Sequence, residues 1–145
     1  KSTGLRFFTV YGPWGRPDMA YYLFTKKIFE NEVIDVYNFG DMSRDFTYID
    51  DIVRGIKSAV KNNYDYEVFN LGNNRAERLT SMIKIIENNL CIKAKVNLKP
   101  MQLGDIKKTY ANLDKAENML NYKPTTKFEF GMKEFINWFY QYYNL

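Results

Sequence analysis

Apolar positions along this chain recur at two spacings, and stretches of the two kinds alternate from one end to the other. Short apolar runs bounded by glycine, asparagine or other polar residues predict β-strands, which we place at 5–10, 33–39, 44–48, 67–71 and 94–98. Apolar residues three and four positions apart predict amphipathic helices, which we place at 19–30, 52–60, 80–90, 113–120 and 128–142. Strands and helices therefore alternate, and this order predicts an α/β fold.

Residue types within these stretches predict how each one packs and where each helix begins. The run 5–10 lacks alternation apart from Arg6 and Thr9, which is typical of a strand covered on both faces. Short polar residues ahead of the helices are the candidate N-caps: Asp18, Thr47 or Asp50, Thr80 and Asp114. The helical positions that share one face are Leu23, Phe24, Lys27, Ile28, Ile52, Val53, Ile56, Ala59, Val60, Met82, Ile83, Ile86, Leu90, Met132, Phe135, Ile136 and Phe139. Residues 100–110 are expected to be irregular.

The composition limits the class of protein. Apolar residues make up 46% of the 145 residues, which is enough for one packed domain and argues against disorder. No apolar run approaches the roughly 18 residues that a membrane helix needs, and no signal-peptide pattern opens the chain. Cys91 stands alone, so we expect no internal disulfide and a cytoplasmic location. Histidine is absent, which excludes an imidazole base, and we expect no metal site.

The net charge of +4 raises the question of a nucleic-acid partner. The lysines are scattered over separate predicted elements and form no single basic stripe. A solvated lysine surface explains this pattern better than a nucleic-acid interface does, so we expect no nucleic-acid binding. Binding that survives 200 mM salt would support a basic nucleic-acid module instead.

Two segments carry candidate binding chemistry. The strand at 5–10 runs into a loop that contains Gly12, Trp14 and Arg16. Arg44 stands directly before an aromatic strand. Loops that leave strands hold ligand-contacting groups in α/β enzymes, and two cations delivered from separate loops suit an anionic, phosphate-bearing small molecule.

The sequence also lacks features of a complete dinucleotide-binding enzyme. No Gly-x-x-Gly-x-x-Gly or Gly-x-Gly-x-x-Gly turn opens a first strand–helix unit, so no phosphate-binding turn for a dinucleotide is expected here. The predicted strands are too few for a full doubly wound sheet. We therefore interpret residues 1–145 as the C-terminal portion of a longer protein.

Together these segments resemble the extended short-chain dehydrogenase/reductases, within the NAD-dependent epimerase/dehydratase family. The matching segments are LRFFTVYGPWGRPDM at 5–19, IDVYNFG at 34–40, RDFTYIDD at 44–51, FNLG at 69–72 and QLGD at 102–105. Within the superfamily the chain is most similar to the UDP-glucuronate 4-epimerases of capsule polysaccharide synthesis, because the run YGPWGRPDM is specific for that branch. The similarity spans the whole of residues 1–145.

The resemblance implies a function and a division of labour. Relatives oxidise the C4 hydroxyl of UDP-glucuronate with NAD, rotate the keto sugar and return the hydride, giving UDP-galacturonate. The glycine turn for NAD, a Ser/Thr and the Tyr-x-x-x-Lys pair would lie in a preceding half, so no catalytic residue is assigned within this chain. The resemblance further implies that the full-length relative is a homodimer and that this portion alone is inactive.

The resemblance also assigns roles near the sugar and the cofactor. Thr9 would contact the sugar ring, Arg16 would meet the sugar carboxylate, and Phe8 would lie near the nicotinamide of NAD. Ala20 and Tyr21 would bring helix backbone to the nucleotide. Each assignment has a structural alternative: a strand threonine, a solvated loop arginine or a core aromatic.

The remaining implied contacts are with UDP. Tyr37, Asn38 and Phe39 would meet uracil through their backbone atoms. Arg44 would bind the pyrophosphate; the alternative is that it pairs with Asp45 or Asp50. Gln102 and Asp105 would lie on a loop that closes over the nucleotide. Many relatives carry arginine at the position of Gln102, and here Lys107 or Lys108 could replace that charge. For the acidic pair Asp50 and Asp51 we expect helix capping.

Other activities stay open at this point. The chain could belong to a UDP-glucose 4-epimerase, a dTDP-glucose 4,6-dehydratase or a UDP-glucuronate decarboxylase. It could also be a nucleotide-sugar-binding piece without catalysis of its own. The run beginning at Trp14 and the presence of Gln102 favour the UDP-glucuronate 4-epimerase.

Overall fold

In the computed structural model, which describes residues 1–145, the strands form three small sheets. β1 (Ser2–Phe7) pairs in parallel with β5 (Tyr66–Leu71). β4 (Ser43–Tyr48) lies between β2 (Thr9–Tyr11), which is parallel to it, and β6 (Ala76–Arg78), which is antiparallel. β3 (Val33–Val36) pairs in parallel with β7 (Lys95–Leu98). The fold is therefore α/β, as predicted, with mainly parallel pairing.

Five α-helices and one 3-10 helix, η1 (Tyr37–Gly40), complete the fold. The α-helices are α1 (Ala20–Phe29), α2 (Ile49–Asn62), α3 (Leu79–Leu90), α4 (Asp114–Leu120) and α5 (Phe128–Tyr143). No helix among them combines the length and the apolar character that crossing a membrane requires.

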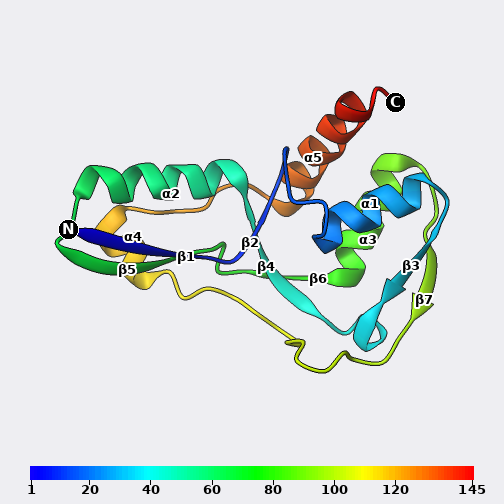
Figure 1. The fold of residues 1–145 in the computed structure, drawn as a ribbon, viewed down its shortest axis with the longest axis horizontal. Helices are drawn as coiled ribbons and strands as arrows, with labels where there is room; N and C mark the ends of the chain where they lie inside the picture. The colour runs from blue at the N-terminus through cyan, green and yellow to red at the C-terminus, as the bar shows by residue number, and fades with distance from the viewer.

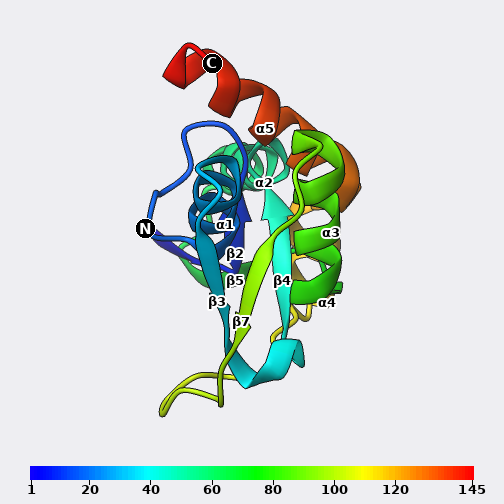
Figure 2. The ribbon, with the colours of Figure 1, turned by 90° about the vertical axis from the view of Figure 1, so that its right-hand side faces the viewer.

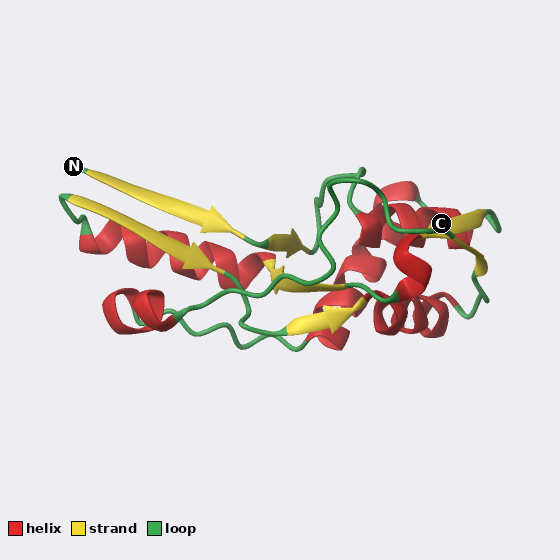
Figure 3. Ribbon diagram, turned by 90° about the horizontal axis from the view of Figure 1, so that it is seen from below, coloured by secondary structure: helices red, strands yellow, loops and turns green.

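The side chains form two separate cores at the two ends of an elongated molecule (Figure 1). The larger core has 18 buried residues, drawn chiefly from α1, α3, α5 and the strands β2, β3 and β4. The smaller core has nine, from α2, α4, β5 and the segment before α4. Figure 3 shows α2 running alongside β1 and β5 at one end, whereas β3 and β7 face the viewer at the other end in Figure 2. β4 lies between the two ends (Figure 1).

A long irregular segment, 99–113, also connects the two ends (Figure 1). It leaves β7, follows β4 and reaches the smaller core at Ala111 and Leu113. The Ser43 N–H donates to the Lys107 carbonyl (N to O, 2.9 Å), and the Thr109 N–H donates to the Ser43 carbonyl (3.2 Å). These bonds place the predicted irregular loop beside the beginning of β4, where Arg44 lies.

The first predicted strand needs correction. It splits at Phe8 into β1 and β2, which belong to different sheets. Within residues 1–145, the Phe7 side chain is 49% exposed, and β1 pairs with β5 alone. An apolar run without alternation suited a covered strand, but periodicity cannot detect a change of sheet within the run.

Two further strand predictions need correction. The predicted strand at 33–39 stops at Val36, because Asn38 and Phe39 adopt left-handed backbone angles (φ of 47° and 51°) that end the extended chain. β6 was missed, since three residues with the sequence Ala-Glu-Arg carry no strand signal. The remaining strand and helix positions are confirmed to within a few residues.

The predicted N-caps are wrong for all four helices to which one was assigned. The residues at the N-cap positions of α1, α2, α3 and α4 are Met19, Tyr48, Arg78 and Leu113, and none makes a side-chain cap bond. The side chains of two predicted caps bond to other residues: Asp18 pairs with Arg16, and Thr47 donates to Asp45. Asp114 lies inside α4, and its backbone N–H donates to the Asn112 side chain. The face predicted for α2 also needs correction, because Val53 (36% exposed) and Val60 (74%) point outward.

Two buried carboxylates join segments that are distant in sequence. Asp45, fully buried, accepts hydrogen bonds from the Asn73 N–H (2.7 Å), the Ala111 N–H (2.9 Å) and Thr47 Oγ1 (3.0 Å). Asp51, 1% exposed, accepts from two backbone N–H groups of 125–126 and pairs with Arg54. Asp51 therefore does not cap its own helix as expected. Both carboxylates are satisfied because backbone donors replace the water lost on burial.

Candidate functional site

One cavity, of about 380 Å³, lies between α1, the beginning of β4 and the 99–113 segment, and we call it the Arg44 cavity. Half of its lining residues are apolar, and six are charged. The lining residues are Asp18, Ala20, Leu23, Phe24, Lys27, Asp35, Tyr37, Met42, Arg44, Phe46, Glu77, Leu79, Gln102 and Asp105. An apolar cavity with a few converging charged groups is the usual form of a small-molecule site.

The face of α1 forms one wall of this cavity. Ala20, Leu23, Phe24 and Lys27 follow the i, i+3, i+4, i+7 spacing that places residues on one helix face. The neighbouring face packs against α5, where the Tyr21 ring lies edge-on to Phe135 at 4.8 Å. Leu23 is 39% exposed although it is apolar. The apolar spacing predicted for the first helix therefore includes residues that line the cavity, such as Leu23, as well as residues of the core, such as Ile28.

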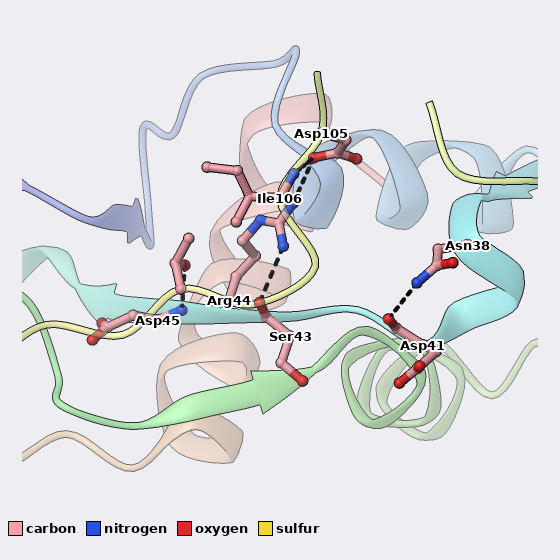
Figure 4. Close-up of polar contacts among 8 residues, drawn as sticks. Asn38, Asp41, Ser43, Arg44, Asp45, Asp105 and Ile106 are labelled. Atoms are coloured by element: carbon pink, nitrogen blue, oxygen red, sulfur yellow. Dashed lines mark hydrogen bonds and ion pairs between the residues drawn. The ribbon is translucent and has the colours of Figure 1, made fainter. Parts of the chain in front are cut away.

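Arg44 lines this cavity and has hydrogen-bond partners on both sides (Figure 4). Its Nη2 is 2.6 Å from Asp105 Oδ1, and its Nη1 donates to the Ser43 carbonyl at 3.1 Å. The Arg44 side chain is 23% exposed. The alternative that Arg44 pairs with Asp45 or Asp50 is wrong, because Asp45 is engaged by backbone N–H groups and Asp50 makes no ion pair. One face of a half-buried guanidinium thus remains available inside the cavity.

The electrostatics of the cavity are mixed. The Asp35 carboxylate accepts from Lys99 Nζ (2.7 Å) and Asn97, and these bonds lower the pKa of Asp35. Burial raises the pKa of Glu77, and the negative charge of Glu129 raises it further. Lys99 also lies 5.9 Å from the centre of the Tyr37 ring. Of the two lining cations, Arg44 is paired, and Lys27 makes no ion pair within 4.0 Å.

A second cavity, of about 370 Å³, lies at the ends of β1 and β2 under the loop that leads to α1, and we call it the Arg16 cavity. Its lining residues are mainly apolar: Phe7, Phe8, Val10, Tyr11, Gly12, Pro13, Trp14, Gly15, Arg16, Met19, Tyr21 and Ile49. Arg16 bonds to Asp18 through Nε (3.0 Å) and Nη2 (2.6 Å), and both side chains are more than half exposed. Because Asp18 lines the Arg44 cavity, this ion pair stands where the two cavities adjoin.

The structure brings some of the predicted site residues together and separates others. Five of them line the Arg44 cavity: Ala20, Tyr37, Arg44, Gln102 and Asp105. Three line the Arg16 cavity: Phe8, Arg16 and Tyr21. Arg44 and Arg16 thus lie in adjoining cavities, not in one. Tyr21 is 1% exposed, and burial raises its pKa to about 12.

Three predicted contacts lie outside both linings. Thr9 is half-buried in β2, opposite Phe46 of β4. Asn38 and Phe39 follow Tyr37 in η1, and two of their backbone groups already have partners. The Phe39 N–H donates to the Lys99 carbonyl (3.1 Å), and the Asn38 carbonyl accepts from Asp41 (2.9 Å). Both residues have left-handed backbone angles in place of the extended backbone of the strand predicted at 33–39.

The spacing Tyr-x-x-x-Lys, which the resemblance places in a preceding half, also occurs within this chain, at Tyr22 and Lys26. Each of these two side chains has another partner. The Tyr22 hydroxyl is hydrogen-bonded to that of Tyr143 (2.8 Å), while Lys26 is exposed and 4.0 Å from Glu30. Burial raises the pKa of Tyr22, whereas a proton-transferring tyrosine requires a lowered one. No cluster of three or more potential metal ligands occurs either.

Sequence reasoning missed four charged residues of the Arg44 cavity: Asp18, Lys27, Asp35 and Glu77. Lys27 could have been found from the apolar spacing of α1, which it shares. Glu77 had no signal, because β6 was not predicted. The two lysines proposed to replace an arginine at position 102 lie elsewhere: Lys107 pairs with Asp41 (2.5 Å), and Lys108 lies 5.5 Å from the centre of the Tyr110 ring.

Comparison with known families and proteins gives a consistent result. Residues 1–72 match the model of the NAD dependent epimerase/dehydratase family. The chain is 55% identical to an uncharacterized protein of Methanocaldococcus jannaschii (96% of this chain, 43% of the relative) and 45% identical to Protein CapI of Staphylococcus aureus (98% and 48%). It is 45% identical to UDP-glucuronate 4-epimerase 4 of Arabidopsis thaliana (98% and 36%). The chain thus spans less than half the length of these relatives.

Solved structures show the same similarity in three dimensions. UDP-glucuronic acid 4-epimerase of Bacillus cereus, in complex with UDP-glucuronic acid and NAD, matches with a TM-score of 0.89 at 34% identity, over 96% of this chain and 45% of that one. UDP-glucose 4-epimerase of Thermotoga maritima, with UDP-glucose, matches with a TM-score of 0.89 at 28% identity, over 97% and 46%. Each match places this chain on somewhat less than half of the larger protein.

Proposed function

Since this chain belongs to the NAD dependent epimerase/dehydratase family, we propose that it is the nucleotide-sugar-binding portion of an epimerase that interconverts UDP-glucuronate and UDP-galacturonate. The observation that carries the proposal is the Arg44 cavity. This cavity combines the half-buried guanidinium of Arg44 with an apolar face of α1. Three further residues for which nucleotide contacts were predicted, Tyr37, Gln102 and Asp105, also line it.

The chemistry of the cavity supports a nucleoside diphosphate as its ligand. A guanidinium presents several donors in one plane and can bind two phosphate oxygens at once. The N-terminal end of α1 begins at Ala20 on the same wall, where unpaired backbone N–H groups favour an anion. The flat apolar surfaces of Leu23, Phe24 and Tyr37 would accommodate a base and a ribose.

The residues present fit one part of NAD. Phe7, Phe8 and Val10 give the Arg16 cavity an apolar floor that suits a nicotinamide ring, and NAD would supply hydride acceptance there. Arg16 is the single cation of that cavity, and the chain lacks a glycine turn for the NAD pyrophosphate. We infer that this chain holds the nicotinamide end at most and contributes no proton-transferring group.

A UDP-glucose 4-epimerase is the second candidate, because the solved enzyme from Thermotoga maritima superposes equally well. The position of Arg16 favours the first candidate, since a cation at the junction of the cavities suits a sugar that carries a carboxylate. A capsule-synthesis role is supported by the similarity to CapI. A homodimeric assembly and a cytoplasmic location stay predictions.

Binding of UDP tests the proposal directly. We expect Arg44→Ala to weaken UDP binding about tenfold or more, since a charge-assisted hydrogen bond contributes about 1.5–3 kcal/mol. Calorimetric titration of the folded 145-residue chain measures the change. Lys107→Ala is the matched control, because Lys107 is on the neighbouring loop, is exposed and does not line the cavity. Equal affinities for Arg44→Ala and the parent chain would refute the site.

Discrimination between two sugars tests the substrate. We expect Arg16→Leu to lower affinity for UDP-glucuronate about tenfold while leaving affinity for UDP-glucose within a factor of about two, because only the first carries a carboxylate. Competition titration with both sugar nucleotides provides the ratio. An equal loss for both would remove the carboxylate role of Arg16 and favour the second candidate.

A further inference from the structure

The loop 12–18 lies beside the C-terminal part of α5 (Figures 1 and 2), and aromatic side chains of the two segments are in contact. The ring centre of Trp14 lies 5.5 Å from that of Trp138 and 5.5 Å from that of Tyr142. Trp138 and Tyr142 are themselves stacked, with centres 5.0 Å apart and planes inclined by 30°. We call Trp14, Trp138 and Tyr142 the aromatic clasp. Such tilted and edge-on pairs are favourable beyond the area that they bury.

The backbone of the loop adopts a conformation that needs external support. Trp14 has a φ of 62°, a left-handed angle that is rare for a bulky residue. Gly12 has a φ of 137°, and the Gly15 N–H closes a turn onto the Gly12 carbonyl at 3.2 Å. A left-handed tryptophan persists only where its surroundings hold it. Trp14 is 77% exposed, so the rings of α5 supply the aromatic contacts that can do so.

The loop in turn determines where Arg16 points. Arg16 follows Trp14 by two residues, and its guanidinium is bonded to Asp18 at the junction of the two cavities. The Arg16 carbonyl accepts from the Met19 N–H at 3.2 Å, which ties the loop to the start of α1. The Arg16 side chain is 74% exposed and pairs only with Asp18 of the same loop, so its direction follows the loop conformation.

We propose that Trp14 is a positioning residue whose clasp onto Trp138 and Tyr142 fixes the loop 12–18 and thereby aims Arg16 at the boundary between the two cavities. The part that concerns sugar preference rests on the proposed function, whereas the part that concerns the loop and Arg16 does not. In this account α5 contributes to ligand discrimination without touching the ligand.

The clasp can be removed without detaching α5. The Tyr22 hydroxyl bonds to that of Tyr143 at 2.8 Å, and Phe29 lies edge-on to Phe139 and Tyr140. These contacts hold α5 against α1 independently of Trp14. Variants at position 14 should therefore remain folded, and a change in the loop can be distinguished from a general loss of structure.

The first measurement asks whether the clasp exists in solution. Trp14 and Trp138 are the two tryptophans of the 145-residue chain, and indole rings at 5.5 Å couple their ultraviolet transitions. Circular dichroism of the chain should show an exciton couplet that Trp14→Phe and Trp138→Phe each abolish. A parent spectrum equal to the sum of two isolated tryptophans would overturn the proposal.

The second measurement follows Arg16 itself, by the NMR signal of its Nε–H group. Hydrogen exchange of this group should be at least about tenfold faster in Trp14→Asn than in the parent, because asparagine tolerates the left-handed angle but lacks the ring. Trp14→Phe should largely restore protection. Tyr143→Phe, which removes the hydroxyl bond between α5 and α1 but keeps the ring beside Tyr142, should leave the exchange as it is in the parent. Equal exchange in Trp14→Asn and the parent, or an equal effect of Tyr143→Phe, would overturn the proposal.

The third measurement is a double-mutant cycle on sugar preference. In the parent chain Arg16→Leu should lower the preference for UDP-glucuronate over UDP-glucose, and in a Trp14→Asn background it should change that preference less than about threefold. An undiminished effect in that background would overturn the proposal. If Arg16→Leu has no effect in the parent chain, the carboxylate role fails, and the exchange of the Arg16 Nε–H still decides whether Trp14 positions Arg16.

Discussion

Single side chains in the Arg44 cavity show how local chemistry can depend on distant sequence. Arg44 and Asp105 are 61 positions apart, yet they form an ion pair of 2.6 Å because the 99–113 segment follows β4. Asp45, the next residue, faces the other way and is used up by three hydrogen-bond donors. Two adjacent charged residues thus differ in role: Arg44 lines a ligand cavity, whereas Asp45 joins segments of the fold through hydrogen bonds.

Glu77 predicts a pH dependence of ligand binding. Its pKa is raised above the ordinary value of 4.5 by burial and by Glu129, so it gains a proton earlier than usual as the pH falls. Protonation removes a negative charge from the cavity lining. Affinity for UDP-glucose, whose diphosphate keeps its charge, should therefore rise about threefold to tenfold as the pH falls through the raised pKa of Glu77.

Glu77→Gln tests this dependence. The variant should bind UDP-glucose more tightly at neutral pH and show a flatter pH profile, whereas the exposed control Glu30→Gln should behave as the parent does. The free energy of unfolding should change with pH in the same direction as the affinity. The raised pKa of Glu77 in the folded state favours folding at low pH, and this contribution is lost as the pH rises through that pKa. A parental pH profile in Glu77→Gln would contradict the role of this residue.

At the scale of elements, the positions at which the helices begin do not coincide with the predicted capping residues. α1, α2 and α3 start after Met19, Tyr48 and Arg78, none of which makes a cap bond. The predicted caps failed because a short polar side chain near a helix start can be taken by a tertiary partner, as Thr47 is by Asp45. Apolar periodicity predicted α3 and α5 well, since Met82, Ile83, Ile86 and Phe135 are all buried.

Asp51 provides a test of how α2 is joined to the segment before α5. Asp51→Ala removes a buried carboxylate that accepts from the two N–H groups of 125–126 and from the half-exposed Arg54, and should destabilise the chain by about 3 kcal/mol. Urea denaturation followed by circular dichroism measures the loss. Asp50→Ala, one residue earlier and exposed, should change stability by less than about 0.5 kcal/mol. Similar losses for the two variants would rule out the specific role of Asp51.

At the scale of the whole molecule, the sequence predicted the fold class and five of the fourteen residues that line the Arg44 cavity. Short-range patterns located the helices, and the family resemblance identified Ala20, Tyr37, Arg44, Gln102 and Asp105, which the structure places around one cavity. The division into two cavities was not predictable, because it depends on the break at Phe8 and on the path of the loop 12–18. Glu77 was missed because β6 gains its extended form from pairing with β4 and not from its own residues.

The absence of a Tyr-x-x-x-Lys pair in working geometry leads to a prediction for the molecule as a whole. Incubated with UDP-glucuronate and NAD, the 145-residue chain should form no detectable UDP-galacturonate, because Tyr22 is held by Tyr143 and Lys26 faces solvent. Chromatography of the nucleotide sugars measures the product. Turnover by the isolated chain, with no other polypeptide present, would contradict both this prediction and the division of labour on which it rests.

The segment 99–113 connects the two cores and therefore affects how they can move relative to each other. One end leaves β7 beside the larger core, the other is anchored by Ala111 and Leu113 in the smaller core, and Gln102 and Asp105 lie between them. A ligand in the Arg44 cavity would contact the segment 99–113 at Gln102 and Asp105, between its two anchored ends. Such a ligand would therefore restrict bending of the larger core relative to the smaller core.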